Sequence, residues 1–155
     1  MRDAIGGAVN IVIIVAFIVI VLAYLAFNVN YTKASRMKNK IIATYEDYNG
    51  VCNNKCKAVI KEYAKEIGYS VGNGFKCPPL TSEEEVSWKK DTYGNYCYRA
   101  ISVHKHNDGD EVISDLGTRY YYDIATRINI EIPIIQNIFD FQLFWVSGNT
   151  KIFYN

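Results

Sequence analysis

The first third of the chain shows two successive hydrophobic patterns. Residues 11–27 (IVIIVAFIVIVLAYLAF) are apolar on every helical face, and Tyr24 carries their only polar side-chain atom. With residues 8–10 the run reaches about 20 residues, enough for a helix to cross a hydrocarbon core about 30 Å thick. A helix that is apolar all round does not lie on a surface as an amphipathic helix does. The pattern therefore predicts a transmembrane helix.

The second pattern is amphipathic and continues the same helix. Neither proline nor glycine occurs from residue 28 to residue 49, and Gly50 fits the left-handed position that follows a helix end. Apolar side chains recur at spacings of three and four, which places them on one helical face: Ala34, Met37, Ile41, Tyr45 and Tyr48. We expect one helix from about Ala8 to Tyr48 whose second half offers this apolar stripe to a globular body.

Beyond Gly50 the period changes from that of a helix to that of strands. Residues Cys52–Ile67 predict a second amphipathic helix, and the alternation over residues 96–103 predicts a strand. The clearest strand is Tyr122–Ile132, which Pro133 ends. No helix is predicted between the strands, so we expect an antiparallel sheet of about four strands with one face to water.

The end of the chain predicts a last hairpin. Its strands would be Phe141–Val146 and Thr150–Tyr154, joined about Ser147-Gly148-Asn149.

Together these elements predict an α+β fold in two parts. Residues 1–30 would form a transmembrane or polymerisation helix, and residues 31–155 a globular domain. The amphipathic half of the helix is expected to pack on the isoleucine face of the C-terminal antiparallel sheet. This helix–sheet seam would consist of Ala34, Met37, Ile41, Tyr45, Tyr48, Ile124, Ile128, Ile130 and Ile132.

Charge and cysteines bear on partners and compartment. A net charge of +1 gives no electrostatic basis for binding nucleic acid. The basic cluster of residues 33–40 follows the apolar run and, by the positive-inside rule, places the body in the cytoplasm. Four cysteines, all in the body, suit two disulfides and an extracytoplasmic location: Cys52, Cys56, Cys77 and Cys97. We give the cysteines more weight than the basic cluster.

The spacing of the cysteines also suggests their pairing. Two cysteines four residues apart on a regular helix do not easily bond each other, so we expect Cys52 and Cys56 each to pair with Cys77 or Cys97. A zinc site made of the four cysteines is the alternative.

Candidate chemistry is sparse. The cluster His104-Lys105-His106 with Asp108 and Asp110 is read as a solvated hairpin tip in preference to a metal site. Glu83-Glu84-Glu85 is read as a solvated face, and Tyr120-Tyr121-Tyr122 as a strand start in preference to a binding surface. Phosphate-binding loops, nucleophile elbows and HExxH motifs are absent from the sequence. We therefore expect no catalytic residue, no metal and no cofactor.

Three features of the chain carry a resemblance to a known family. Gly6-Gly7 precede the apolar run, Tyr31-Thr32-Lys33-Ala34 follow it, and the C-terminal part has the order strand, Ile-Pro, strand over Ile128–Ile135 and Phe141–Tyr154. In these features the chain resembles TadE-like pseudopilins of tight-adherence pilus systems, within the type IV pilin-like proteins. The resemblance makes Gly6 and Gly7 a possible processing site. Residues 8–12 lack the glutamate that usually follows such a site, which favours a minor or unprocessed subunit.

The resemblance implies a non-catalytic structural subunit, a pilin or minor pseudopilin, of an extracellular pilus-type filament or of its assembly or secretion machine. Its partners would be copies of itself or other pilin-like subunits, joined through the N-terminal helix, and the membrane. Small residues on about one side of that helix would allow close packing: Ala16, Ala23 and Ala26. The protein would be a single-pass membrane protein with an extracytoplasmic body, located in a cell-surface filament once assembled.

Two alternatives remain open. A membrane-anchored extracytoplasmic adaptor or binding domain that never polymerises would have the same helix. A cleaved secretory signal would also be apolar, but Asp3 and the lack of a small-residue cleavage site favour an uncleaved anchor.

Overall fold

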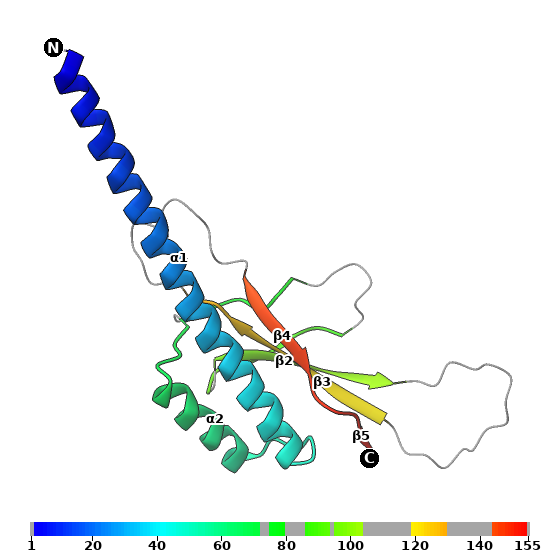
Figure 1. The fold of residues 1–155 in the computed structure, drawn as a ribbon. Coiled ribbons are helices and arrows are strands. Elements are labelled where there is room, and N and C mark those ends of the chain that lie inside the picture. Colours follow the sequence, from blue (N-terminus) through cyan, green and yellow to red (C-terminus); the bar gives the residue numbers. More distant parts are fainter. Residues whose placement is uncertain are drawn as a thin grey trace, which may run out of the picture.

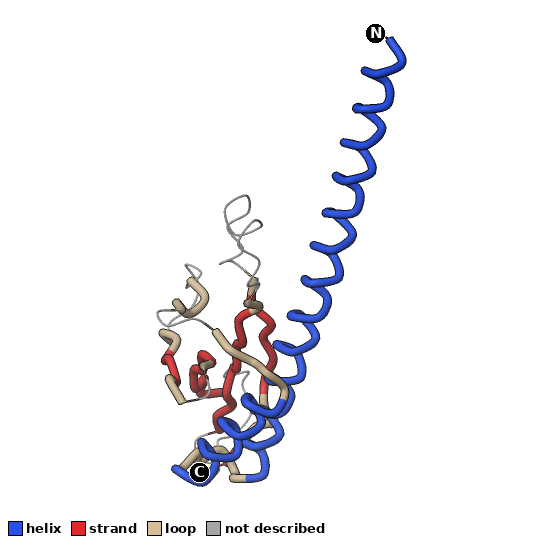
Figure 2. The backbone as a smooth tube through the Cα atoms, turned by 90° about the vertical axis from the view of Figure 1, so that its left-hand side faces the viewer, coloured by secondary structure: helices blue, strands red, loops and turns tan. Residues whose placement is uncertain are grey.

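The computed structural model describes residues 2–71, 75–79, 86–93, 95–103, 119–129 and 144–154, and for residues 2–8 it describes the backbone alone. One long helix carries a compact α+β body on its second half, while its first half projects away from that body (Figures 1 and 2). The predicted α+β layout is therefore confirmed.

The long helix, α1 (Arg2–Asp47), is unbroken and begins nearer the N-terminus than predicted. It ends where Asn49 and Gly50 take left-handed backbone conformations, with φ of 50° and 78°. The N–H of Gly50 donates to the carbonyl of Tyr45 at 2.8 Å, which satisfies one of the free carbonyls at the helix end. A Cβ on Gly50 would lie 3.0 Å from the Phe153 ring, so this turn needs glycine for its conformation and for its space.

The second helix, α2 (Asn54–Glu66), confirms the predicted amphipathic segment with a later start. Asn53 caps it, because its side-chain oxygen accepts from the backbone N–H groups of Lys55 and Cys56 at 3.0 and 3.1 Å. Buried side chains occur at spacings of four: Cys56, Ile60 and Ala64.

The strands form one antiparallel sheet: β1 (Lys89–Asp91), β2 (Tyr96–Val103), β3 (Arg119–Arg127), β4 (Trp145–Asn149) and β5 (Phe153–Tyr154). Their order is β1-β2-β3-β4, and β5 also pairs with β3. β4 and β5 therefore occupy successive stretches of the same edge of β3. The predicted antiparallel arrangement is confirmed, with five described strands in place of about four.

Six of the seven described residues of the predicted seam between helix and sheet are buried. Ala34, Met37 and Ile41 are fully buried, and Tyr45 nearly so. On the sheet side Ile124 and Ile128 are buried as well. Tyr48 is only partly buried, whereas Ile130 and Ile132 lie outside the described residues.

Polar contacts fix the position of α1 on the sheet. The Thr126 hydroxyl donates to the Ala34 carbonyl at 2.9 Å, and the Lys151 N–H donates to the Glu46 carboxylate at 2.7 Å. These bonds join segments 92 and 105 residues apart in the sequence.

The expectation that the second face of the sheet meets water holds only in part. Because Thr126 faces α1, its neighbour Ala125 and the paired Cys97 face the other way, yet both are fully buried. Cys77 is bonded to Cys97, and the Phe75 ring lies 6.4 Å from that of Trp145 on β4. Residues 75–79 therefore cover the part of this face around Cys97 and Ala125, whereas Val103, Ser147 and Asn149 on the same face are exposed.

The predicted hairpin about Ser147-Gly148-Asn149 is also wrong. These residues lie inside β4, where Gly148 pairs with Ile124. A Cβ on Gly148 would come within 3.1 Å of Lys38 and 3.2 Å of Ile42 on α1. The glycine therefore permits a close approach of helix to strand and does not make a turn.

Candidate functional site

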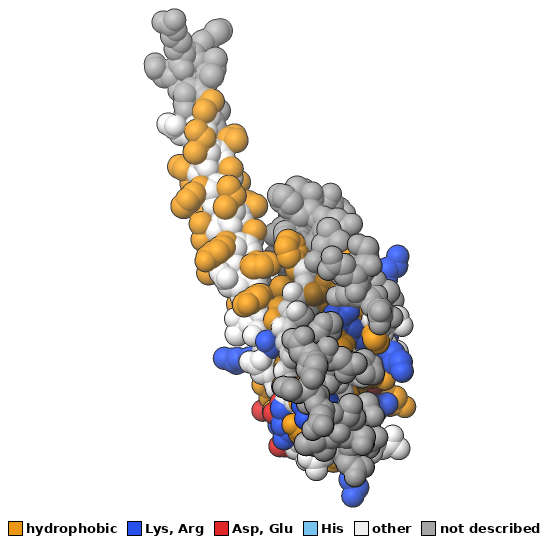
Figure 3. Space-filling model, turned by 90° about the vertical axis from the view of Figure 1, so that its right-hand side faces the viewer, with side chains coloured by type: hydrophobic (Ala, Val, Ile, Leu, Met, Phe, Trp, Pro, Cys, Tyr) orange, Lys and Arg blue, Asp and Glu red, His pale blue; other side chains and the backbone are white. Residues whose placement is uncertain are grey.

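The apolar half of α1 is the main feature that the body leaves uncovered. From Val9 to Leu25 almost every side chain is exposed, with Phe17 and Ile20 both 66% exposed. Figure 3 shows apolar side chains gathered along this part of the helix, with Lys and Arg beginning at the level of the body. This one N-terminal helix is long and apolar enough to cross a membrane, a property that it shares with signal sequences.

The three predicted packing alanines differ in their surroundings. Ala16 is exposed, whereas Ala23 and Ala26 are partly covered. Further along α1, Phe27 contacts the described body, with its ring 6.0 Å from that of Phe144. Ala16 is thus free of contacts with the described body. The backbone of Gly6 and Gly7 is helical and belongs to α1.

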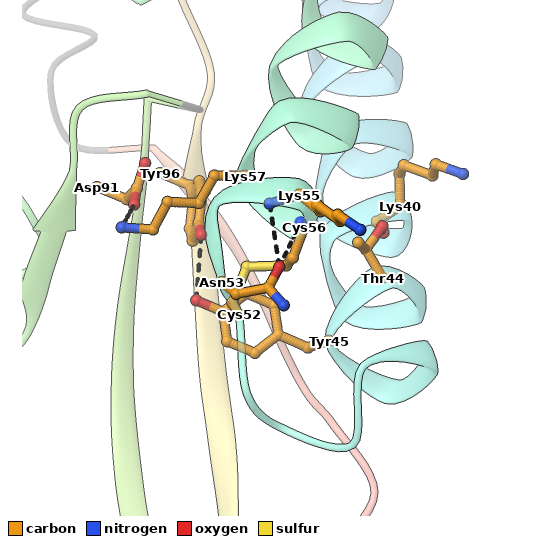
Figure 4. Close-up of a disulfide and its surroundings, with 10 residues drawn as sticks. All are labelled: Lys40, Thr44, Tyr45, Cys52, Asn53, Lys55, Cys56, Lys57, Asp91 and Tyr96. Atoms are coloured by element: carbon orange, nitrogen blue, oxygen red, sulfur yellow. Dashed lines mark hydrogen bonds and ion pairs between the residues drawn. A yellow bond between two sulfur atoms is a disulfide. The ribbon is translucent and has the colours of Figure 1, made fainter.

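Both predicted disulfides form, but their expected pairing is wrong. Cys52 is bonded to Cys56, with a Cα–Cα distance of 5.2 Å, and Cys77 is bonded to Cys97. The expectation placed Cys52 on the helix, whereas α2 begins only at Asn54. Cys52 precedes the Asn53 cap and folds back over the first turn (Figure 4). All four thiols are used in disulfides, which excludes the alternative of a four-cysteine zinc site in this state.

A tyrosine cluster lies beside the seam and consists of Tyr45, Tyr96, Tyr98, Tyr120 and Tyr122. The hydroxyls of Tyr45 and Tyr96 are 3.1 Å apart and share a hydrogen bond (Figure 4). Burial raises the pKa of both hydroxyls well above the ordinary value of tyrosine, and it raises the pKa of Tyr122 as well. These groups remain protonated and contribute to packing. The interpretation of residues 120–122 as a strand start is confirmed, because all three lie in β3.

Tyr69 is a further buried tyrosine that the sequence did not single out. Its hydroxyl donates to the Arg127 carbonyl at 3.1 Å and accepts from the Arg127 N–H at 3.0 Å. It therefore satisfies the backbone of Arg127 at the end of β3, and burial raises its pKa well above the ordinary value.

Charged groups of the body form ion pairs. Arg99 bonds Asp123 at 2.8 Å across β2 and β3, and Lys57 lies 3.5 Å from Asp91 (Figure 4). Within the described ranges, no group of three or more His, Cys, Asp or Glu side chains could hold a metal ion. The other candidates of the sequence lie outside the described residues: His104, Lys105, His106, Asp108, Asp110, Glu83, Glu84 and Glu85.

A groove between α1 and the end of α2 was not predicted from the sequence. It has a volume of about 500 Å³ and is lined by Asn28, Val29, Thr32, Lys33, Arg36, Glu66 and Ile67. The basic cluster predicted its cations, but only the folded body brings Glu66 opposite them.

No protein-family model matches the chain, and no curated protein or solved structure matches it either.

Proposed function

We propose that the protein is a non-catalytic, pilin-like structural subunit of an extracellular pilus-type filament or of its assembly machine. The observation that carries this proposal is the division of α1 into two halves. Its first half is exposed and apolar. One face of its second half is buried in the core of a body that contains two disulfides. One continuous helix thus joins an exposed apolar segment, residues 9–25, here called the rod, to a compact body.

The apolar surface of the exposed rod must be shielded from water. Apolar patches of more than a few hundred Å² are rare on monomeric soluble proteins, and this rod is apolar along about 25 Å of helix. Lipid tails can cover it, and so can the rods of neighbouring subunits in a helical bundle. Because the body lies at one end of α1 only, bundled rods would place the bodies outside (Figures 1 and 2).

Two properties of the body suit an exposed filament surface. Disulfides persist in oxidising compartments outside the cytoplasm, and this body has two of them with no free cysteine. They support an extracytoplasmic body in spite of the basic residues that follow the rod. Burial on both faces of the central strand gives a small domain a fuller core than one open face would.

Substitutions in the rod can distinguish a filament subunit from a membrane-anchored adaptor. A helix that only anchors the protein in lipid requires sufficient length and hydrophobicity. A helix in a bundle also requires side chains that fit against its neighbours, because larger side chains at close helix contacts are destabilising. The test is the double variant Ala16→Leu/Ala23→Leu. Its matched control is Ile14→Leu/Val21→Leu, which changes two exposed positions of the same spacing and adds no bulk comparable to that of alanine to leucine.

Both variants are expressed in the native cell and followed by two measurements, membrane fractionation and recovery with sheared surface filaments. We expect both to insert into the membrane, since leucine favours insertion. The alanine variant should be lost from the filaments, whereas the control should be recovered like the wild type. Wild-type recovery of the alanine variant, or absence of the unmodified chain from filaments and from complexes with other subunits, would favour the adaptor.

A further inference from the structure

The groove between α1 and α2 lies where the apolar half of the long helix ends. Its first lining residue, Asn28, directly follows the apolar run, and Lys33 and Arg36 come one and two turns later. The opposite wall is the C-terminal end of α2, with Glu66 and Ile67. The groove is therefore placed at the junction of rod and body.

The cations of the groove are available to a ligand. Arg36 is exposed and forms no ion pair with any described residue. The Lys33 ammonium makes one long hydrogen bond, at 3.4 Å, to the Gly68 carbonyl. With Glu66 on the other wall, the three charged lining side chains sum to one positive charge, from two cations and one anion.

Helix geometry places these cations near a bilayer surface when the rod is in lipid. Lys33 and Arg36 lie six and nine residues beyond Phe27, so their Cα atoms are about 9 and about 13 Å further along the axis, and the headgroup layer is about 5–7 Å thick. Side chains of an α-helix lean toward its N-terminus, which here is toward the rod. Long basic side chains cover the remaining distance by extending to the interface.

We propose that this groove binds the headgroup of an anionic phospholipid of the phosphatidylglycerol type. The phosphodiester would lie on Lys33 and Arg36, and its charge of −1 would neutralise the groove. The headgroup hydroxyls would donate to the Glu66 carboxylate, which a choline headgroup cannot do. The proposal depends on the proposed function only for its membrane stage, in which the rod is surrounded by lipid.

The test uses the full chain purified in mixed micelles of phosphatidylglycerol, phosphatidylcholine and mild detergent, with bound phospholipid counted by native mass spectrometry. The variant is Lys33→Gln/Arg36→Gln. The control is Lys55→Gln/Lys89→Gln, which removes the same charge from exposed positions outside the groove. We expect the wild type and the control to retain phosphatidylglycerol over phosphatidylcholine. In the groove variant, the ratio of bound phosphatidylglycerol to bound phosphatidylcholine should fall about fivefold for each cation removed.

Equal preference in the groove variant and the control would overturn the proposal, as would equal retention of the two lipids by the wild type. Soluble glycerol phosphate is added in excess as a second arm. Persistence of bound lipid supports a headgroup site, whereas complete displacement would show a site for free phosphate and overturn the lipid assignment. Filament recovery does not enter these measurements, so the lipid site and the filament proposal can fail separately.

Discussion

Replacing Ile41 by aspartate places a carboxyl group in the middle of the seam between α1 and the sheet. Ile41 is fully buried, and truncation of a buried isoleucine to alanine costs about 2–5 kcal/mol. A carboxylate without a partner adds a desolvation cost, or must take up a proton to avoid it. We expect the free energy of unfolding to fall by about 4 kcal/mol or more. This is a large part of the total for a typical domain, which is about 5–15 kcal/mol.

The assay is urea unfolding of the oxidised full chain in detergent micelles, followed by near-ultraviolet circular dichroism of its 13 tyrosines and 2 tryptophans. The matched control is Asn39→Asp, which introduces the same group at an exposed position two residues away and should change stability by about 0.5 kcal/mol at most. Lys40→Asp is a less clean control, because the Lys40 ammonium lies 5.7 Å from the centre of the Tyr63 ring. Equal losses from Ile41→Asp and Asn39→Asp would refute the seam.

Two further predictions concern the disulfides and the tyrosine cluster. Replacing both cysteines of the Cys77–Cys97 disulfide by alanine should cost about 3 kcal/mol, against about 2 kcal/mol for Cys52–Cys56, because the bonds close loops with separations of 20 and 4 residues. Urea midpoints measure this order, and the reverse order would contradict the loop argument. Buried hydroxyls of the tyrosine cluster have raised pKa values, so the folded state keeps protons that the unfolded state releases. The contribution of these tyrosines to stability should therefore be constant below about pH 10 and fall as the pH rises further, with buried tyrosines ionising only as the circular dichroism is lost. Ionisation of every tyrosine near pH 10 in a folded protein would contradict this prediction.

The sequence was sufficient for features that depend on neighbours along the chain. The spacing of Ala34, Met37 and Ile41 predicted the buried stripe, because a helical face follows from a period of 3.6 alone. Gly50 likewise marked the end of α1, since the left-handed turn after a helix is a local requirement.

Features that depend on distant segments were missed or misread. Gly148 resembles a turn residue until α1 is known to pass directly beside it. The pairing of Cys52 depends on the helix beginning at Asn54, a boundary that pattern reasoning fixes only to within a few residues. The cover over part of the second face of the sheet consists of the segment around Cys77, whose sequence has no periodicity that would predict this role.

The arrangement of α1 against the last strands has a consequence for how the protein is made. Glu46 leaves the ribosome 105 residues before its partner Lys151, and β4 emerges only shortly before Lys151. At about 5–20 residues per second, the apolar stripe of α1 waits about 5–20 s for the strands that cover it. During this interval the rod has already emerged and can enter the membrane ahead of the body. The order of synthesis thus allows the rod to insert before the body folds, and the body closes only after β4 and Lys151 have been synthesised.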